Sequence, residues 1–190
     1  ITRVNEGTLL LGKTAGGDAF AGRLIVGDGI GGPNADVVRL LASNVTNNSG
    51  GASNDHSATV TTSGLLDLNN FSTRFYHGSA YALILEIGDT GAGNVVTGTG
   101  TLTTTGSIGL TVVGTGAVGA TISGNLYWGV TRNSGINDGA ALNDLTISAN
   151  ITGPDFVSLI KYGSGRLLLT GTNTHYYTDV KSGTLAVSNN

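Results

Sequence analysis

Acidic residues are the first candidates for catalysis, because glycoside hydrolysis uses two carboxylates that face one sugar, about 5–9.5 Å apart. In this sequence they are spread singly along the chain. Asp67 and Glu86 are the pair that successive coils of a stacked fold could bring together. A solvated strand residue or a turn cap is the simpler interpretation of each carboxylate, and we predict no enzymatic activity. The acidic positions weighed are Asp18, Asp28, Asp36, Asp67, Glu86, Asp89, Asp138, Asp144 and Asp155.

Metal and nucleophile chemistry finds little support in the sequence. His56, His77 and His175 fall in three separate segments that read as loops, and the chain has no cysteine. This spacing does not suit a transition-metal site. The segment Gly31–Val38 loosely matches a calcium-binding nonapeptide, but a single copy is better explained as a turn capped by Asn34 and Asp36. We therefore predict no cofactor and no metal.

Aromatic side chains are the remaining candidates for a binding surface. Aromatic rings can stack on sugars, but they can equally cover an open end of a fold or pack against a neighbouring subunit. We treat six of them as candidate glycan or subunit contacts. They are Tyr76, Tyr81, Tyr127, Trp128, Tyr176 and Tyr177.

Composition indicates many short strands joined by tight turns. The 190 residues include 32 glycines and only 2 prolines, and Thr, Ser, Asn and Val recur throughout. Glycine supplies positive φ at turns, and β-branched residues favour strands.

Nine basic and twelve acidic residues give a net charge of −3, so the chain offers no basic surface for nucleic acid. No apolar run is long enough for a transmembrane helix, and we predict no membrane insertion by this segment.

The hydrophobic pattern predicts an all-β fold with almost no helix. Strand and turn units recur every ~8–12 residues, which suits a sandwich, a barrel or a solenoid. Strands of small Thr, Val, Gly and Leu residues favour a parallel β-solenoid, whose narrow interior accepts stacked aliphatic side chains. An antiparallel β-sandwich is the alternative. The polar stretch 43–57 is predicted to be a protruding loop.

Two segments far apart in the sequence echo each other. Residues 4–9 read VNEGTL and residues 180–185 read VKSGTL, and Thr2 matches Thr178 in the same alignment. Self-similarity at a fixed offset indicates a repeat array. We therefore interpret residues 1–190 as a single solenoid segment that contains one repeat of about 176 residues and the start of the next.

The last thirty residues carry the clearest motif. They read KYGSGRLLLTGTNTHYYTDVKSGTLAVSNN, with two apolar strands at 166–170 and 184–188. This run resembles the autotransporter-associated β-strand repeat, although His175 stands where that repeat usually has tyrosine. The matching positions are Lys161, Gly163, Gly165, Leu167, Leu169, Gly171, Asn173, Val180, Gly183 and Leu185.

The resemblance implies a right-handed parallel β-helix that serves as a scaffold in a secreted or cell-surface protein of a Gram-negative-type bacterium. Combined with the echo, it predicts a structural extracellular protein that stacks end to end into a fibre, stalk or surface layer. The partners would then be other copies or adjoining repeats of the same sequence. The alternatives are an adhesin that binds surface glycans through the aromatic residues and, less favoured, a polysaccharide-cleaving enzyme.

Overall fold

The computed structural model describes residues 1–13, 18–20, 22–46, 55–129 and 131–188. Seventeen strands form one continuous sheet system, and the described residues contain no helix. No helix that could cross a membrane is therefore found in this part of the chain. The prediction of an all-β chain is confirmed.

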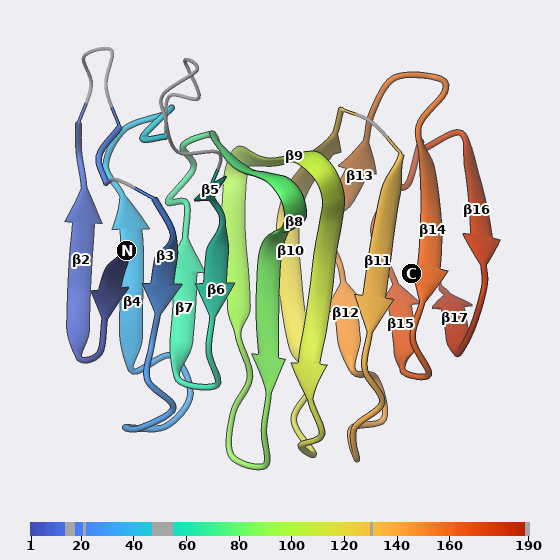
Figure 1. Cartoon of the computed structure of the whole chain (residues 1–190), viewed down its shortest axis with the longest axis horizontal. Helices are drawn as coiled ribbons and strands as arrows, with labels where there is room; N and C mark the ends of the chain where they lie inside the picture. Colours follow the sequence, from blue (N-terminus) through green and yellow to red (C-terminus); the bar gives the residue numbers. More distant parts are fainter. Residues whose placement is uncertain (14–17, 21, 47–54, 130, 189–190) are drawn as a thin grey trace.

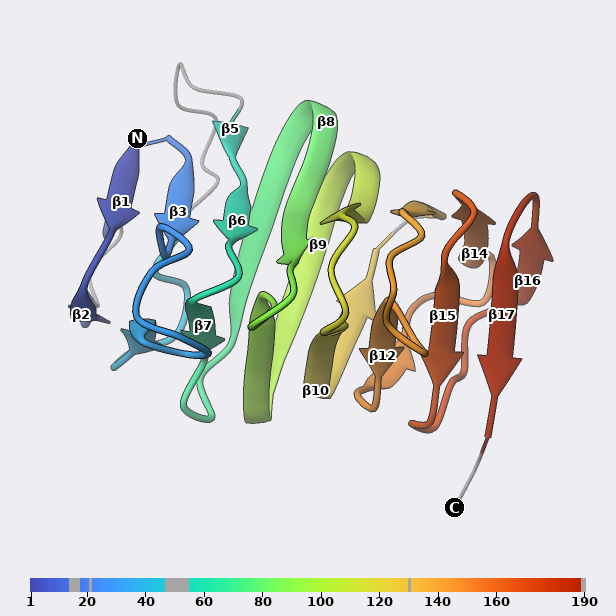
Figure 2. The ribbon, with the colours of Figure 1, turned by 90° about the horizontal axis from the view of Figure 1, so that it is seen from below.

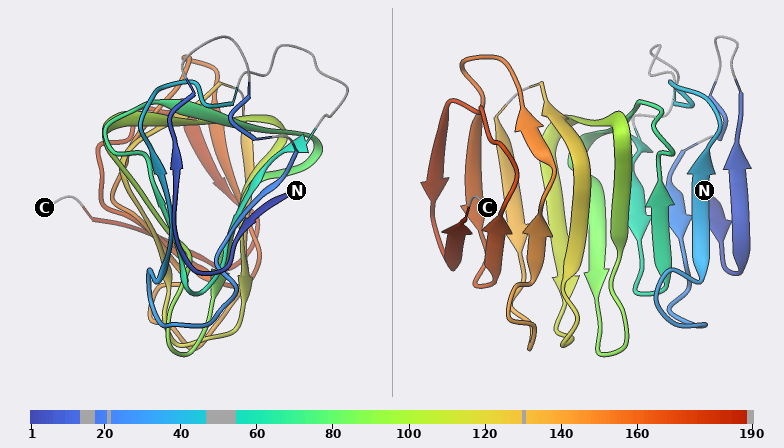
Figure 3. Two further views of the ribbon diagram at one scale, coloured as in Figure 1. Left: turned by 90° about the vertical axis from the view of Figure 1, so that its left-hand side faces the viewer. Right: turned by 180° about the vertical axis from the view of Figure 1, so that it is seen from behind.

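The strands stack side by side as successive coils (Figure 1), and the coils have two or three faces (Figure 3). Face A is built from β1 (Thr2–Val4), β3 (Leu24–Val26), β6 (Ala58–Val60), the second part of β8 (Thr73–Ile87), the last part of β9 (Asn94–Gly114), β11 (Arg132–Ile136), β14 (Ser158–Tyr162) and β16 (Tyr177–Val180). Face B is built from β2 (Gly7–Leu11), β4 (Asp36–Leu40), β7 (Gly64–Asp67), the first parts of β9 and β10 (Ala120–Trp128), β12 (Leu145–Ile147), β15 (Arg166–Leu169) and β17 (Thr184–Val187). Face C is built from the first part of β8, the middle of β9, the end of β10 and β13 (Asn150–Thr152).

The coils form a right-handed parallel β-helix. Viewed from the N-terminal end, the chain runs down face A, around the narrow lower corner and up face B, which is clockwise as it recedes (Figure 3). Every pairing between named strands in the described residues is parallel, apart from that of β5 (Asp55–His56) with β8. This arrangement confirms the predicted solenoid and excludes the antiparallel sandwich.

Stacked aliphatic side chains fill the interior. Along face A, Leu24, Ala58, Leu83 and Leu110 are successive partners and all are buried. The alternate residues point outward, as the two-residue period of a strand requires. Because each coil places a similar residue over the last one, small and β-branched side chains suffice to close a narrow core.

Coil length varies along the chain. The number of residues between successive partners in one column gives the length of each coil. In one column of face A the partners are Thr2, Leu24, Ala58, Leu83 and Leu110. Of the four coils between them, the first is the shortest and the second is the longest. Several coils also include face C, where β8 and β9 bend around the corners as continuous strands (Figure 2). The unit that repeats in the fold is thus a single coil, whose length is not fixed.

The predicted loop 43–57 needs correction at both ends, because Val45 belongs to the core and Thr46 is buried. Residues 47–54 lie outside the described residues. Asp55 and His56 form β5, which pairs with His77 and Tyr76 of β8, and Ser57 is buried. Residues 55–57 therefore belong to the body of the solenoid, because β8 extends past the corner and offers β5 an edge to pair with.

The echoed segments form the same corner in the first and last coils. Val4 ends β1 and Val180 ends β16, and both chains then turn from face A onto face B. Gly7 and Gly183 adopt positive φ, 79° and 71°, which favours glycine over other residues. The echo therefore has a structural basis, while the longer array of such repeats stays a prediction.

A buried lysine, Lys161, lies at the corner between β14 and β15. The Lys161 side chain lies in an inward column of face A and is fully buried. Its Nζ donates to the carbonyl oxygens of Gly163 (2.9 Å) and Ser182 (3.0 Å), so it joins two successive coils. Burial lowers the pKa of Lys161, while Asp144 and Asp138 oppose that shift. The lysine of the sequence motif thus acts as a structural donor to backbone carbonyls.

Replacing Lys161 with methionine tests this role. Lys161→Met keeps the aliphatic stem but removes the charged donor from two carbonyls, so we expect the free energy of unfolding to fall by about 1–3 kcal/mol. Urea denaturation followed by circular dichroism measures the change. The exposed Lys13→Met control should stay within about 0.5 kcal/mol of the parent. An equal loss in both variants would contradict the proposed role.

Candidate functional site

The structure disperses the six candidate aromatic residues. Trp128 is fully buried in β10, with its ring centroid 6.0 Å from that of His175, so the expectation that it contacts a glycan or subunit is wrong. Its position in the strand alternates with Tyr127, which points outward. Tyr127 is 36% exposed, and Tyr76 and Tyr81 are half-buried in β8. These residues occupy faces A and C and form no continuous strip.

Tyr176 and Tyr177 are the exception. Tyr177 begins β16 in the last coil and Tyr176 directly precedes it, and they are 48% and 70% exposed. Their rings meet edge to face, with centroids 6.2 Å apart. Of the six candidates, these two are the most exposed and the best placed to contact a partner.

The proposed pair of carboxylates does not meet. Asp67 lies in β7 on face B, where its Oδ2 accepts a hydrogen bond from Arg39 Nε (2.8 Å). Glu86 lies in the part of β8 that belongs to face A, opposite Val113. Burial raises the pKa of Glu86. The pairing was wrong because the two residues are separated by less than one coil and so fall on different faces, whereas stacked residues lie one full coil apart.

The segment Gly31–Val38 forms a turn followed by a strand. Asn34 adopts a left-handed conformation (φ 57°) and its Oδ1 accepts a hydrogen bond from Asn94 Nδ2 (3.0 Å). The buried Asp36 begins β4 and accepts a hydrogen bond from Ser63 Oγ (2.6 Å). Within the described ranges, no group of three or more His, Cys, Asp or Glu residues is placed to hold a metal.

Two of the histidines lie in strands and not in loops. His56 belongs to β5 and His77 to β8, and β5 pairs antiparallel with β8. His56 Nε2 lies 3.1 Å from Asp18 Oδ2. The third, His175, lies between β15 and β16, where burial lowers its pKa.

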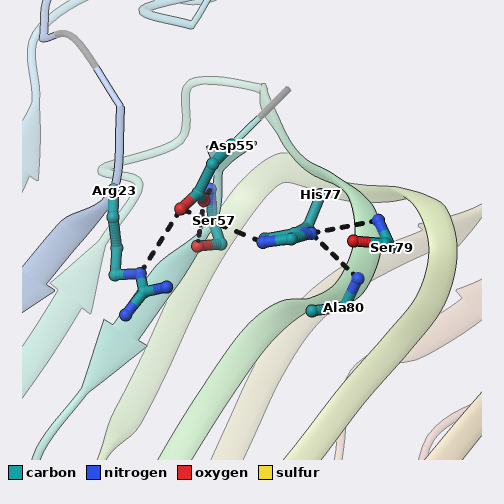
Figure 4. Close-up of polar contacts among 6 residues, drawn as sticks. All are labelled: Arg23, Asp55, Ser57, His77, Ser79 and Ala80. Atoms are coloured by element: carbon teal, nitrogen blue, oxygen red, sulfur yellow. Dashed lines mark hydrogen bonds and ion pairs between the residues drawn. The ribbon is translucent and has the colours of Figure 1, made fainter. Parts of the chain in front are cut away.

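A polar cluster at the top of face A was not predicted from the sequence (Figure 4). Asp55 Oδ1 accepts hydrogen bonds from the backbone N–H (3.0 Å) and Oγ (2.5 Å) of Ser57. Its Oδ2 lies 3.5 Å from Arg23 Nε and 3.9 Å from His77 Nε2. Only the Asp-x-Ser spacing, which favours a local turn, hinted at any of these contacts. Arg23 and His77 come from other coils.

The contacts of His77 define its tautomer. Its Nδ1 accepts hydrogen bonds from the backbone N–H groups of Ser79 (3.1 Å) and Ala80 (2.8 Å), so the proton of the neutral ring lies on Nε2, which faces Asp55. Burial disfavours ionisation of Asp55, but the hydrogen bonds from Ser57, with His77 and Arg23, lower its pKa below the ordinary value.

Serine, histidine and aspartate meet here in an arrangement unsuited to nucleophilic catalysis. A catalytic serine donates its proton to the histidine, which the aspartate orients. Here Ser57 donates directly to Asp55, and Ser57 is buried. The cluster therefore fastens β5 and β6 to the neighbouring coils.

The first and last coils among the described residues are the remaining candidate surfaces. Within the described residues, β1 and β2 pair on one side only, with β3 and β4, and β16 and β17 pair only with β14 and β15. Each end therefore presents strand edges with unpaired backbone groups. Leu9 at one end and Leu185 at the other pack against the core but stay partly exposed.

Comparisons with known proteins add no relative. No protein-family model, no curated protein and no solved structure matches the chain. The fold places the protein in the class of parallel β-solenoids, and its function must be argued from its surfaces.

The charge of Asp55 can be tested through stability. Asp55→Asn should lower the free energy of unfolding at pH 7 by about 1–2 kcal/mol, because hydrogen bonds to a charged group are lost. Since the folded-state pKa of Asp55 is lowered, its contribution is present above the unfolded-state pKa and disappears as pH falls through the folded-state pKa. Urea midpoints of variant and parent should therefore converge below about pH 3.

The exposed Asp155→Asn provides the matched control, and it should leave the urea midpoint unchanged at both pH values. A difference between Asp55→Asn and the parent that stays constant down to about pH 2 would show that the charge is not the source of the stabilisation.

Proposed function

We propose that this chain is a structural, extracellular β-solenoid that stacks end to end into a fibre, stalk or surface layer. The observation that carries the proposal is the pair of open ends. Both present two parallel strand edges and a partly exposed core leucine, Leu9 or Leu185. Unpaired edges of this kind favour association with another strand.

The shape of the two ends supports stacking over a random contact. Both end coils present one strand of face A and one of face B, joined by a corner with a left-handed glycine. A second copy placed end on would continue two parallel ladders and the core between them. Other β-solenoids behave as one-dimensional arrays in which each repeat contacts its neighbours.

The body of the molecule suits a scaffold. The interior is packed with aliphatic side chains, and the buried Arg132 donates to the carbonyl of Thr104 in the preceding coil (2.6 Å). Asn125 Nδ2 donates to the Gly100 carbonyl one coil before it (3.1 Å), and Asn150 Nδ2 continues this ladder to Asn125 Oδ1 (3.4 Å). Such coil-to-coil contacts stiffen the stack along its axis.

Export to a bacterial cell surface is part of the proposal. Its support is the resemblance of residues 161–190 to the autotransporter-associated β-strand repeat. Of the residues that carry this resemblance, Lys161 lies at a buried corner and Leu167 and Leu169 lie in the core.

Assembly can be observed directly. Face A carries eight strand segments, so one copy adds on the order of 40 Å along the axis at about 4.8 Å per coil. We expect filaments with that axial repeat in electron micrographs and concentration-dependent sedimentation of the purified chain. A monodisperse monomer at high micromolar concentration would refute stacking.

A glycan-binding adhesin is the competing function, and the exposed pair Tyr176 and Tyr177 is the feature that would support it. If Tyr176→Ala abolished binding on a glycan array while filaments still formed, recognition of sugars would be the better explanation of this pair. We expect no glycan binding above background from the parent chain. Tyr127→Ala serves as the control on another face.

A further inference from the structure

End-to-end stacking leaves one question open, namely which residues face each other across the junction. Two of the alignments that keep inward residues over inward residues differ by a single inward position. One continues the columns of the solenoid, which place Val180 in the column of Thr2 and Leu185 in the column of Gly7. The other is shifted along the strands by one inward position and places Val180 opposite Val4 and Leu185 opposite Leu9.

We propose that the C-terminal edge of this chain, β16 and β17, binds the N-terminal edge, β1 and β2, of a second copy in the shifted alignment, with Val180 opposite Val4. The inference rests on the proposed function and specifies its interface. Residues 177–188 would then lie opposite residues 1–12 one by one, which is the alignment of the sequence echo.

The core favours this alignment. It places Val180 on Val4, Leu185 on Leu9 and Val187 on Leu11, so these three inward positions meet aliphatic partners. Val180 and Val187 are 43% and 61% exposed in the single chain and would become buried. The column alignment also pairs Val187 with Leu9, but it sets Leu185 on Gly7 and Ser182 on Val4, which leaves these two inward positions poorly filled.

The corner favours it as well. Val4 is the last residue of β1 and Val180 is the last residue of β16, so the shifted alignment brings the ends of the two strands together. It also places Gly7 opposite Gly183, the two corner glycines with positive φ. The column alignment would set Gly183 opposite Asn5, away from the equivalent bend.

Outward charges separate the alignments most clearly. The shifted alignment sets Asp179 directly opposite Arg3, whereas the column alignment sets Lys181 opposite Arg3. Opposite charges across neighbouring strands stabilise a sheet, and like charges directly opposite destabilise it. Asp179 already bonds Lys181 (2.7 Å), so Arg3 of the next copy would complete a row of alternating charge.

Apolar surface adds to the match. Ile1 is 81% exposed at one end and Tyr177 is 48% exposed at the other, and the shifted alignment places them opposite each other. An aromatic residue across from a β-branched one is a favourable pair in a sheet. This assigns Tyr177 to the contact with another copy.

Disulfide trapping tests the alignment, because the chain has no cysteine of its own. Thr8 and Thr184 both point outward and would be direct neighbours, with Cα atoms about 4.8 Å apart. In the column alignment Thr8 would instead face Ala186. The wrong partner would lie about 8 Å away, beyond the reach of a disulfide.

We expect the double variant Thr8→Cys/Thr184→Cys to form covalent oligomers on mild oxidation, seen as a ladder on non-reducing gels and removed by reductant. The matched variant Thr8→Cys/Ala186→Cys should stay largely monomeric on the same gel. A ladder from the second variant alone, or from neither variant although filaments form, would overturn the alignment and leave stacking intact.

Charge reversal provides a second test of the alignment that needs no cysteine. Arg3→Asp should raise the concentration needed for filaments about 2- to 10-fold, because the new carboxylate would face Asp179, and Arg3→Asp/Asp179→Arg should restore much of the loss. The column alignment predicts the reverse, since an aspartate at position 3 would attract Lys181. If the unmodified chain forms no filaments, stacking itself fails and the alignment fails with it.

Discussion

The structure depends on one constraint, which is that every coil must satisfy its backbone N–H and C=O groups through the coils on either side. In a parallel solenoid no strand completes its hydrogen bonds within its own coil. Leu83 of β8, for example, pairs with Ala58 of the coil before it and with Leu110 of the coil after it. The columns of aliphatic side chains follow from this stacking, because partners in a ladder must also share the interior.

The same constraint explains how much of the fold the sequence could predict. Alternation of apolar and small polar residues with glycine at the bends is compatible with few folds, and stacking aligns like residues, so a solenoid could be inferred from residues 161–190 alone. The positive φ of Gly163 and Gly183 confirms the physical meaning of those motif glycines. The right-handed sense of the β-helix could be inferred only from the family resemblance.

The arrangement of surface residues could not be inferred, because it depends on the length of each coil. Along face A the step from Leu24 to Ala58 is much longer than the step from Thr2 to Leu24 before it or the step from Lys161 to Val180 at the other end, so spacing in the sequence does not translate into distance. Asp67 and Glu86 therefore lie on different faces, while Asp55, Arg23 and His77 converge. Burial of Trp128 was missed for a related reason, since a one-residue change of phase within β10 decides whether this ring or its neighbour points inward.

The ends of the chain expose the constraint in its most direct form. An interior coil has its partners supplied by its own chain, but β1, β2, β16 and β17 have partners on one side only within the described residues. Backbone pairing alone would accept any strand in any register. Specificity must therefore come from side chains, and the outward residues near the corner are the ones that differ in charge: Arg3 at one end, Asp179 and Lys181 at the other. In the proposed stacking, these few charged residues would set the direction and register in which a second copy is added.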